Sequence, residues 1–143
     1  MTSPLPNGDS CIRAMRDALT DAQLSSEQID YINAHASSTQ LNDATETMSI
    51  KQVFGESTKI PVSGTKGYYS HPLGATGAIE AILAVLALQH QWIPPTINYA
   101  NPDPACDLDV VPNHGRAAKL NFVMSNSFGF GGINACAILG GVR

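Results

Sequence analysis

The segment GTKGYYSHPLGATGAIEAILAVLALQH, residues 64–90, decides the fold of this chain. It begins as a polar turn that contains glycine and continues as a stretch that is apolar on every side of a helix. Glu80 is the one ionisable residue between Pro72 and Leu88. A helix that is apolar all round is normally buried in a core, and proline suits the first helical position because no N–H is needed there. The segment therefore predicts a buried helix over residues 72–88.

Two basic side chains lie close to the start of this predicted helix. His71 directly precedes it, where the helix dipole disfavours an imidazolium ion and favours a neutral ring. Lys66 adds positive charge in the same turn. Glu80, a lone carboxylate in an apolar helix, would be costly to bury without a partner. We therefore expect Lys66 and Glu80 to form an ion pair.

Length and composition exclude several classes of protein. A chain of 143 residues is one domain or part of one, and 43% hydrophobic residues are enough for a folded core. A net charge of −4, with scattered basic residues, argues against a nucleic-acid partner. The longest apolar run, Ala81–Leu88, is too short to span a bilayer, and the first ten residues lack a signal-peptide pattern. Three cysteines at unrelated spacings give no disulfide framework, so a reducing, cytoplasmic location is the simplest interpretation.

Outward from the apolar helix, the pattern predicts a layered α/β or α+β domain of order β-α-β-α-β-β after a leading helix. The expected elements are a helix over 11–22, a strand over 29–34, a helix over 43–54, a strand over 60–63, and strands over 120–126 and 133–139. The last two strands are joined by the short link SFGFGG and should pair antiparallel. Residues 1–8 are expected to form a turn-rich or disordered leader.

Polar side chains outside the apolar helix have competing interpretations. His35 leaves a strand end, where functional groups of α/β sheets collect, although a histidine bonded to the backbone of an ordinary loop fits the same position. Asp43 and Glu46 are best explained as carboxylates in the first turn of a helix. A structural role is favoured for the cysteines, namely Cys11, Cys106 and Cys136. Three aspartates in one loop lack EF-hand spacing and indicate a solvated connection: Asp103, Asp107 and Asp109.

Four motifs occur in one order along the chain: NAHASSTQLND at 33–43, GTKGYYSHPLGATGAIEA at 64–81, PPTINYANPDPACDLDVVPN at 94–113 and NSFGFGGINA at 126–135. Together they resemble the C-terminal half of the β-ketoacyl-[acyl-carrier-protein] synthases, the elongating condensing enzymes of fatty-acid and polyketide synthesis. The resemblance covers the chain from about Gly8 to Ile138 and implies an α/β, thiolase-like fold across residues 1–143. In that fold two similar halves pack through long core helices, so the other half would cover the outer face of the apolar helix.

The resemblance also implies roles for single residues. His35 and His71 match the two active-site histidines, which would donate hydrogen bonds to the thioester oxygen of a malonyl unit and stabilise the enolate formed on decarboxylation. Lys66 matches the lysine that organises charge around the second histidine and pairs with the glutamate at Glu80. The backbone N–H of Phe130 would supply one arm of an oxyanion hole.

Further residues are matched to substrate binding. Phe128 and Phe130 would shape and gate the acyl pocket, while Ser37 and Thr39 would bind the phosphopantetheine arm. The resemblance implies no metal and no cofactor of the chain's own, because acyl carrier protein brings the substrates. The implied partners are acyl carrier protein, an N-terminal half and, in the full-length enzyme, a second copy. No nucleic-acid or membrane partner is expected.

The chain departs from the family pattern at three places. Ser70 and Ala36 replace common glycines beside the two histidines, and the loop reads GYYSHPLG where SMTGHLLG is more usual. The nucleophilic cysteine of the family lies in an N-terminal half that this chain does not contain. None of the three cysteines matches it, so we expect the isolated chain to be an acyltransferase fragment without activity.

Two other functions compete with a condensing enzyme. A non-catalytic partner, like the chain-length-factor subunits that resemble ketosynthases, has no physical need for His35, Lys66 and His71 together. A metal hydrolase that uses the four histidines is disfavoured, because no pair of them has metal-ligand spacing. Both fatty-acid and polyketide synthesis fit the motifs.

Overall fold

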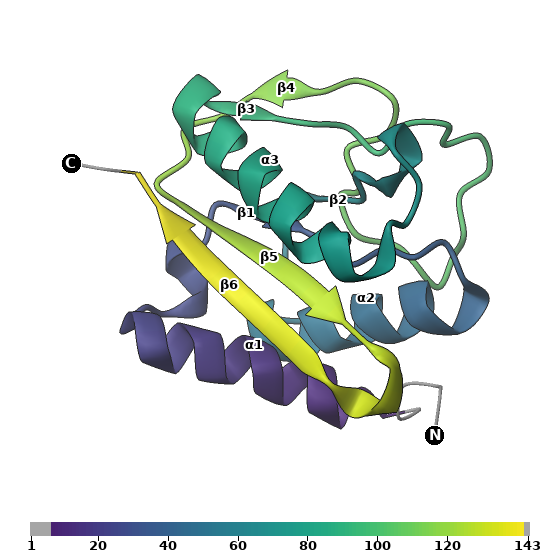
Figure 1. Cartoon of the computed structure of the whole chain (residues 1–143), viewed down its shortest axis with the longest axis horizontal. Coiled ribbons are helices and arrows are strands. Elements are labelled where there is room, and N and C mark those ends of the chain that lie inside the picture. The colour runs from purple at the N-terminus through teal and green to yellow at the C-terminus, as the bar shows by residue number, and fades with distance from the viewer. Residues whose placement is uncertain (1–6, 142–143) are drawn as a thin grey trace.

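The structure is a computed structural model that describes residues 7–141, with the helices and strands of one layered α/β domain (Figure 1). Most of the predicted leader, residues 1–6, therefore lies outside the described residues. A four-stranded sheet has the order β2-β1-β5-β6. Its strands are β1 (Tyr31–Asn33), β2 (Val62–Ser63), β5 (Phe122–Phe128) and β6 (Asn134–Gly140). β1 is parallel to both of its neighbours, whereas β5 and β6 pair antiparallel, as their short link predicted.

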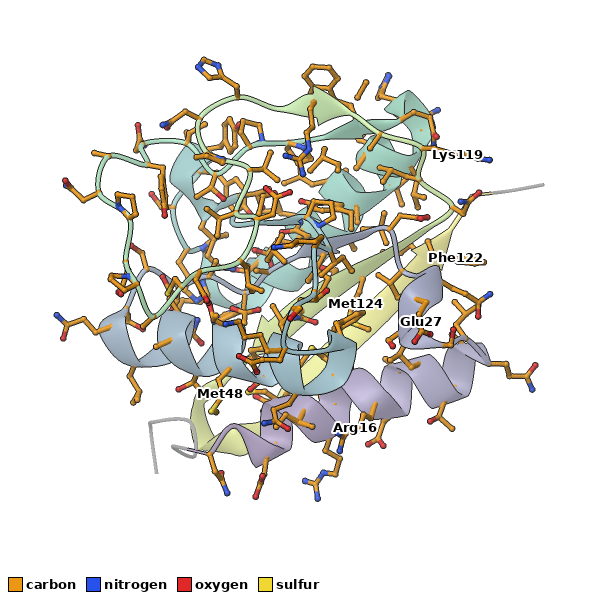
Figure 2. All side chains as sticks on the ribbon, turned by 180° about the vertical axis from the view of Figure 1, so that it is seen from behind. Arg16, Glu27, Met48, Lys119, Phe122 and Met124 are labelled. Atoms are coloured by element: carbon orange, nitrogen blue, oxygen red, sulfur yellow. The ribbon has the colours of Figure 1, made fainter. Side chains whose placement is uncertain are left out.

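Alternation along the central strands builds two cores, one on each face of the sheet. Ile32 and Met124 pack with residues of α1 (Asp9–Ala22) and α2 (Gln40–Phe54), while Tyr31 and Val123 pack with α3 (Thr76–His90). All four of these side chains are fully buried. Figure 2 labels Met124 between the sheet and the two helices, with Arg16 on the outer side of α1. The sheet is therefore the middle of three layers.

The start of the apolar helix differs from the prediction. α3 begins at Thr76 and not at Pro72, and residues Leu73–Ala75 form a separate 3₁₀ turn. Leu73 has a φ of 50°, a left-handed conformation that cannot continue into an α-helix. Its N–H instead donates to Nδ1 of His71 at 3.3 Å. The sequence therefore predicted His71 directly at the start of the helix, whereas one 3₁₀ turn separates His71 from α3.

One face of α3 is exposed in this chain, namely the outer face that the family resemblance assigns to contact with the other half of the fold. Ala84, Ala87 and Leu88 are buried against the sheet, whereas Ile82 is 61% and Val85 46% exposed. The helical stretch Leu73–His90 is apolar and long enough, by length and composition, to cross a membrane, although core helices of soluble proteins pass the same test. The eight-residue run considered in the sequence thus understates the apolar length.

The remaining elements surround the sheet. α2 begins three residues before its predicted start, because the Thr39 hydroxyl accepts the N–H of Asn42 at 3.3 Å and caps the helix. A separate antiparallel ribbon pairs β3 (Trp92–Ile93) with β4 (Arg116–Ala117). The long connection between these two strands contains the acidic segment. An ion pair from Lys51 of α2 to Asp107, at 2.6 Å, holds this connection against α2.

Candidate active site

Two histidines meet at one edge of the sheet. His35 follows β1, and His71 follows the 3₁₀ turn Lys66–Tyr68 that comes after β2. Because β1 and β2 are parallel, their carboxyl ends lie side by side and bring the two loops together. The ring centroids are 5.3 Å apart and the planes cross at 78°. The buried ring of His35 and the exposed ring of His71 thus form one edge-to-face pair.

Both imidazoles are held neutral. Burial, followed by the charge of Lys66 and the proximity of His71, lowers the pKa of His35 to about 4. The pKa of His71 is also lowered, by partial burial and then by Lys66. Nδ1 of His35 is buried without a hydrogen-bond partner in the described part of the chain, whereas Nδ1 of His71 lies 3.0 Å from Oγ1 of Thr76. Neutral rings of this kind can donate a hydrogen bond to an oxygen that gains negative charge.

The expected pairing of Lys66 with Glu80 is present. Nζ of Lys66 lies 2.5 Å from Oε1 of Glu80, and both side chains are buried. Lys66 also donates a hydrogen bond to the backbone carbonyl of His35. Burial raises the pKa of Glu80, and the neighbouring ammonium group opposes this shift. The lysine therefore links the base of α3 to the loop that carries the first histidine.

A second buried carboxylate shapes the same loop, and the sequence did not indicate it. Glu46 accepts the backbone N–H groups of His35 and Ala36 at 2.9 and 2.8 Å, and Nδ2 of Asn126 at 3.2 Å. The interpretation of Glu46 as a first-turn residue is wrong, because α2 begins at Gln40. The sequence does place a carboxylate on the helix that follows the His35 loop. No spacing rule, however, predicts that this carboxylate points back toward that loop.

Backbone strain is concentrated around the histidines. Four residues that are not glycine have φ values in the left-handed region: Ala36 at 38°, Ser38 at 61°, Ser70 at 68° and Leu73 at 50°. Each such conformation is unfavourable for a residue with a side chain and persists only where the surroundings impose it. Gly64 provides one of these constraints, since a Cβ atom there would lie 2.7 Å from Cβ of Ala36.

The predicted acyl-pocket residues are described in part. The ring of Phe128, which is buried, lies 6.1 Å from that of His35. The Phe130 backbone opens a short 3₁₀ turn, Phe130–Gly132, but its side chain lies outside the described part of the structure. The gating role of Phe130 and its N–H in an oxyanion hole stay predictions.

The three cysteines are not activated. Burial raises the pKa of Cys11 to about 11 and also raises the pKa values of Cys106 and Cys136. Their thiols therefore stay protonated near neutral pH, as a structural role requires. Within residues 7–141, no cluster of three or more histidine, cysteine or acidic side chains could hold a metal ion.

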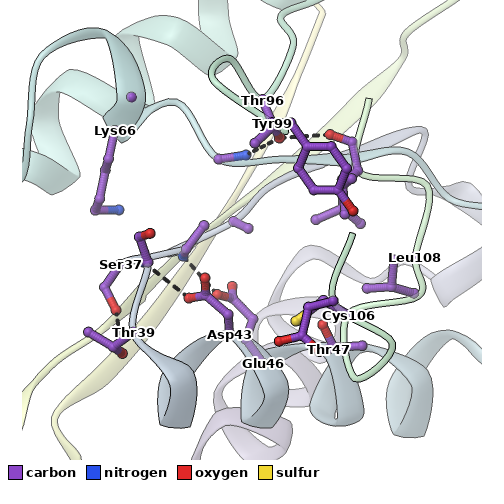
Figure 3. Close-up of a pocket in the computed structure, with 18 of the residues that line it drawn as sticks. Ser37, Thr39, Asp43, Glu46, Thr47, Lys66, Thr96, Tyr99, Cys106 and Leu108 are labelled. Atoms are coloured by element: carbon purple, nitrogen blue, oxygen red, sulfur yellow. Dashed lines mark hydrogen bonds between the residues drawn. The ribbon is translucent and has the colours of Figure 1, made fainter. Parts of the chain in front are cut away.

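A cavity of about 630 Å³ is lined by His71 and by Ala34 and Ala36, the neighbours of His35 in the chain. One part of its lining consists of His71, Lys66, Ser37 and Thr39. The cavity extends from there between α2 and the part of the long connection that contains Cys106 (Figure 3). The hydroxyl oxygens of Ser37 and Thr39 are 3.2 Å apart. The two residues expected to bind a phosphopantetheine arm thus line the same cavity as His71, although their binding role stays a prediction.

Comparison with known proteins identifies the family. The profile of the β-ketoacyl synthase C-terminal domain matches residues 1–100. The chain belongs to the β-ketoacyl synthase family. It is 48% identical, over 140 residues and 97% of its length, to 3-oxoacyl-[acyl-carrier-protein] synthase 2 of Coxiella burnetii. The match spans 34% of that protein, so this β-ketoacyl synthase chain covers about a third of its relative.

Solved structures give the same fold for the β-ketoacyl synthase chain. It superposes on the ishigamide ketosynthase/chain length factor with a TM-score of 0.94 and 42% identity, covering 99% of this chain and 34% of the other. A second solved structure contains a type II polyketide synthase acyl-carrier protein in complex with its ketosynthase, bound to the hexaketide. It gives a TM-score of 0.96 and 40% identity, and the match covers 100% of this chain and 35% of the other. The predicted thiolase-like α/β fold is therefore confirmed.

Proposed function

We propose that this chain supplies the two-histidine part of the active site of a 3-oxoacyl-[acyl-carrier-protein] synthase. The observation that carries the proposal is the pair of neutral imidazoles, His35 and His71, 5.3 Å apart beside the buried Lys66. The reaction is a decarboxylative Claisen condensation of a malonyl thioester with an acyl thioester. Fatty-acid and polyketide synthesis both use this chemistry, and the relatives come from both.

In the proposed reaction, the bond between the α-carbon and the carboxylate of the malonyl unit breaks. Carbon dioxide leaves, and the electron pair moves into the thioester to give an enolate. The two imidazoles donate hydrogen bonds to the enolate oxygen, and this stabilisation is strong in a site with little water. The α-carbon then attacks the acyl thioester, a new carbon–carbon bond forms, and a thiolate leaves. The N–H of Phe130 is one donor to the oxygen that gains charge during acyl transfer.

We propose that the thiol that holds the acyl group comes from outside this chain, because none of its three cysteines matches the nucleophile of the family and burial raises the pKa of each. We propose that an N-terminal ketosynthase region supplies it, in line with the longer relatives. Acyl carrier protein is the proposed substrate carrier, and Ser37 and Thr39 would bind its phosphopantetheine arm. The assembled enzyme is proposed to be a cytoplasmic homodimer.

The first test measures decarboxylation of malonyl-acyl carrier protein by the chain combined with a cysteine-bearing ketosynthase N-terminal region. His71→Ala removes one donor to the enolate and should lower the rate about 100-fold, the effect of losing one such donor. His114→Ala, at an exposed histidine elsewhere, is the matched control and should leave the rate unchanged.

An undiminished rate in His71→Ala would contradict the proposed role. A second candidate, a non-catalytic partner subunit, is favoured by the similarity to a ketosynthase/chain length factor structure. It predicts a stable complex with the N-terminal region that does not decarboxylate in any variant.

A further inference from the structure

The hydroxyl of Tyr69 joins the loop that carries His71 to the base of α3. Oη of Tyr69 lies 3.3 Å from Oε1 of Glu80 and 3.1 Å from Oγ1 of Thr65. A carboxylate can only accept, so the phenol proton goes to Glu80. Tyr69 is two residues before His71, and the residue between them, Ser70, has the strained φ of 68°. The phenol therefore anchors a strained loop.

The same carboxylate oxygen holds the other histidine loop. Oε1 of Glu80 accepts from Nζ of Lys66 at 2.5 Å, and Lys66 donates to the carbonyl oxygen of His35. A continuous set of hydrogen bonds thus runs from Tyr69 through Glu80 and Lys66 to the His35 loop. Thr65 has one hydroxyl proton, which it donates either to Oη of Tyr69 or to Oδ1 of Asn33 in β1, 3.4 Å away.

We infer that Tyr69 is a positioning residue for the histidine pair, acting through its hydroxyl on Glu80. The inference rests on the proposed function of His35 and His71. Tyr69 belongs to the segment GYYSHPLG, where the chain departs from the usual family loop. It does not line the described cavity, so it acts on the placement and charge of other groups and not on substrate contact.

The charge state of Glu80 gives a specific signature. Burial raises the pKa of this carboxyl, whereas the hydrogen bonds from Lys66 and Tyr69 lower it. The titratable groups near Glu80 are Lys66, Tyr69 and Tyr31, with Tyr31 bonded to Ser63. Loss of the phenol hydroxyl favours the protonated carboxyl, and so the ion pair with Lys66 breaks at a higher pH. A residue with only a packing role would not shift this pH.

The experiment compares Tyr69→Phe with Tyr68→Phe in the chain combined with the cysteine-bearing N-terminal region. Tyr68 is a matched control in the same loop, 52% exposed and with no side-chain hydrogen bond in the described part of the chain. Tyr69→Phe should lower kcat for decarboxylation roughly threefold to tenfold, the effect of one hydrogen bond. The acid limb of its pH profile should move to higher pH with KM unchanged. Tyr68→Phe should match the wild type.

Nitrogen NMR of the His71 ring gives a readout that does not need activity. Tyr69→Phe should change the chemical shift or broaden the ring signals, and Tyr68→Phe should not. Identical kinetics, pH profiles and ring signals in the two variants would overturn the inference. An inactive wild type in which Tyr69→Phe alone changes the His71 signal would refute the proposed function while the positioning role stands.

Discussion

Protonation of His35 is coupled to folding, because the buried ring has no room to hydrate a charge. The pKa of His35 falls from 6.5 to about 4 in the folded chain, through burial, the nearby charge of Lys66 and the proximity of His71. The unfolded state then binds more protons than the folded state between these two pH values. The stabilising contribution of the neutral ring is complete above pH 6.5 and is lost as the pH falls through about 4.

His35→Gln should therefore flatten the pH dependence of the free energy of unfolding between pH 6.5 and 4. Across that window the wild type should lose roughly 3 kcal/mol more than the variant, the equivalent of the pKa shift. Urea unfolding at a series of pH values measures the difference, with His114→Gln as an exposed control. Parallel curves for His35→Gln and the wild type would refute the coupling.

At the scale of residues, local spacing predicted the Lys66–Glu80 pair and the family resemblance singled out the two histidines, but neither identified the groups that hold the two loops. A lone carboxylate in an apolar helix requires a partner, and one lysine lay in the adjoining turn, so that pair followed from local spacing. Glu46 and Tyr69 could not be found in this way. Their hydrogen bonds depend on how α2 and α3 pack on the two faces of the sheet, which no periodicity encodes.

At the scale of elements, α3 is tied to the preceding turn by the buried ion pair. Glu80→Gln would leave the ammonium of Lys66 buried without its counter-charge and should lower the free energy of unfolding by about 3 kcal/mol. The double variant Lys66→Met/Glu80→Gln removes both charges and should be more stable than the sum of the single effects predicts.

Thermal or urea unfolding of the two single variants and the double variant measures this coupling. Additive losses of stability would mean that the two side chains do not interact in solution.

The boundaries of α3 show why element ends were harder to predict than element types. Proline is compatible with a helix start, but the N–H of Leu73 bonds to His71 and delays the helix to Thr76.

At the scale of the whole molecule, the order of the strands could not be predicted from the sequence. The pattern gave the number of major strands and the antiparallel last pair, yet β5 lies beside β1, which precedes it by about ninety residues. The exposed face of α3, in contrast to the strand order, could be expected from the sequence. Its apolar residues continue around a helix that has only one face on the sheet.

The exposed apolar face should make the chain associate when no partner covers it. Ile82→Lys places a charge on that face and should shift the sedimenting species toward monomer and reduce binding of a hydrophobic dye. Leu41→Lys changes a side chain of α2 that is 45% exposed, away from α3, and serves as the control. A wild-type chain that sediments as a monomer and binds no dye would contradict this expectation.

The left-handed residues beside the two histidines indicate what aligns the two rings. Free peptides with these sequences would favour the right-handed or extended regions, because side chains at Ala36, Ser38 and Ser70 crowd the backbone in the conformation observed. The meeting of the two imidazoles is therefore a property that the folded domain imposes on its loops, and it cannot be transferred by grafting either loop alone.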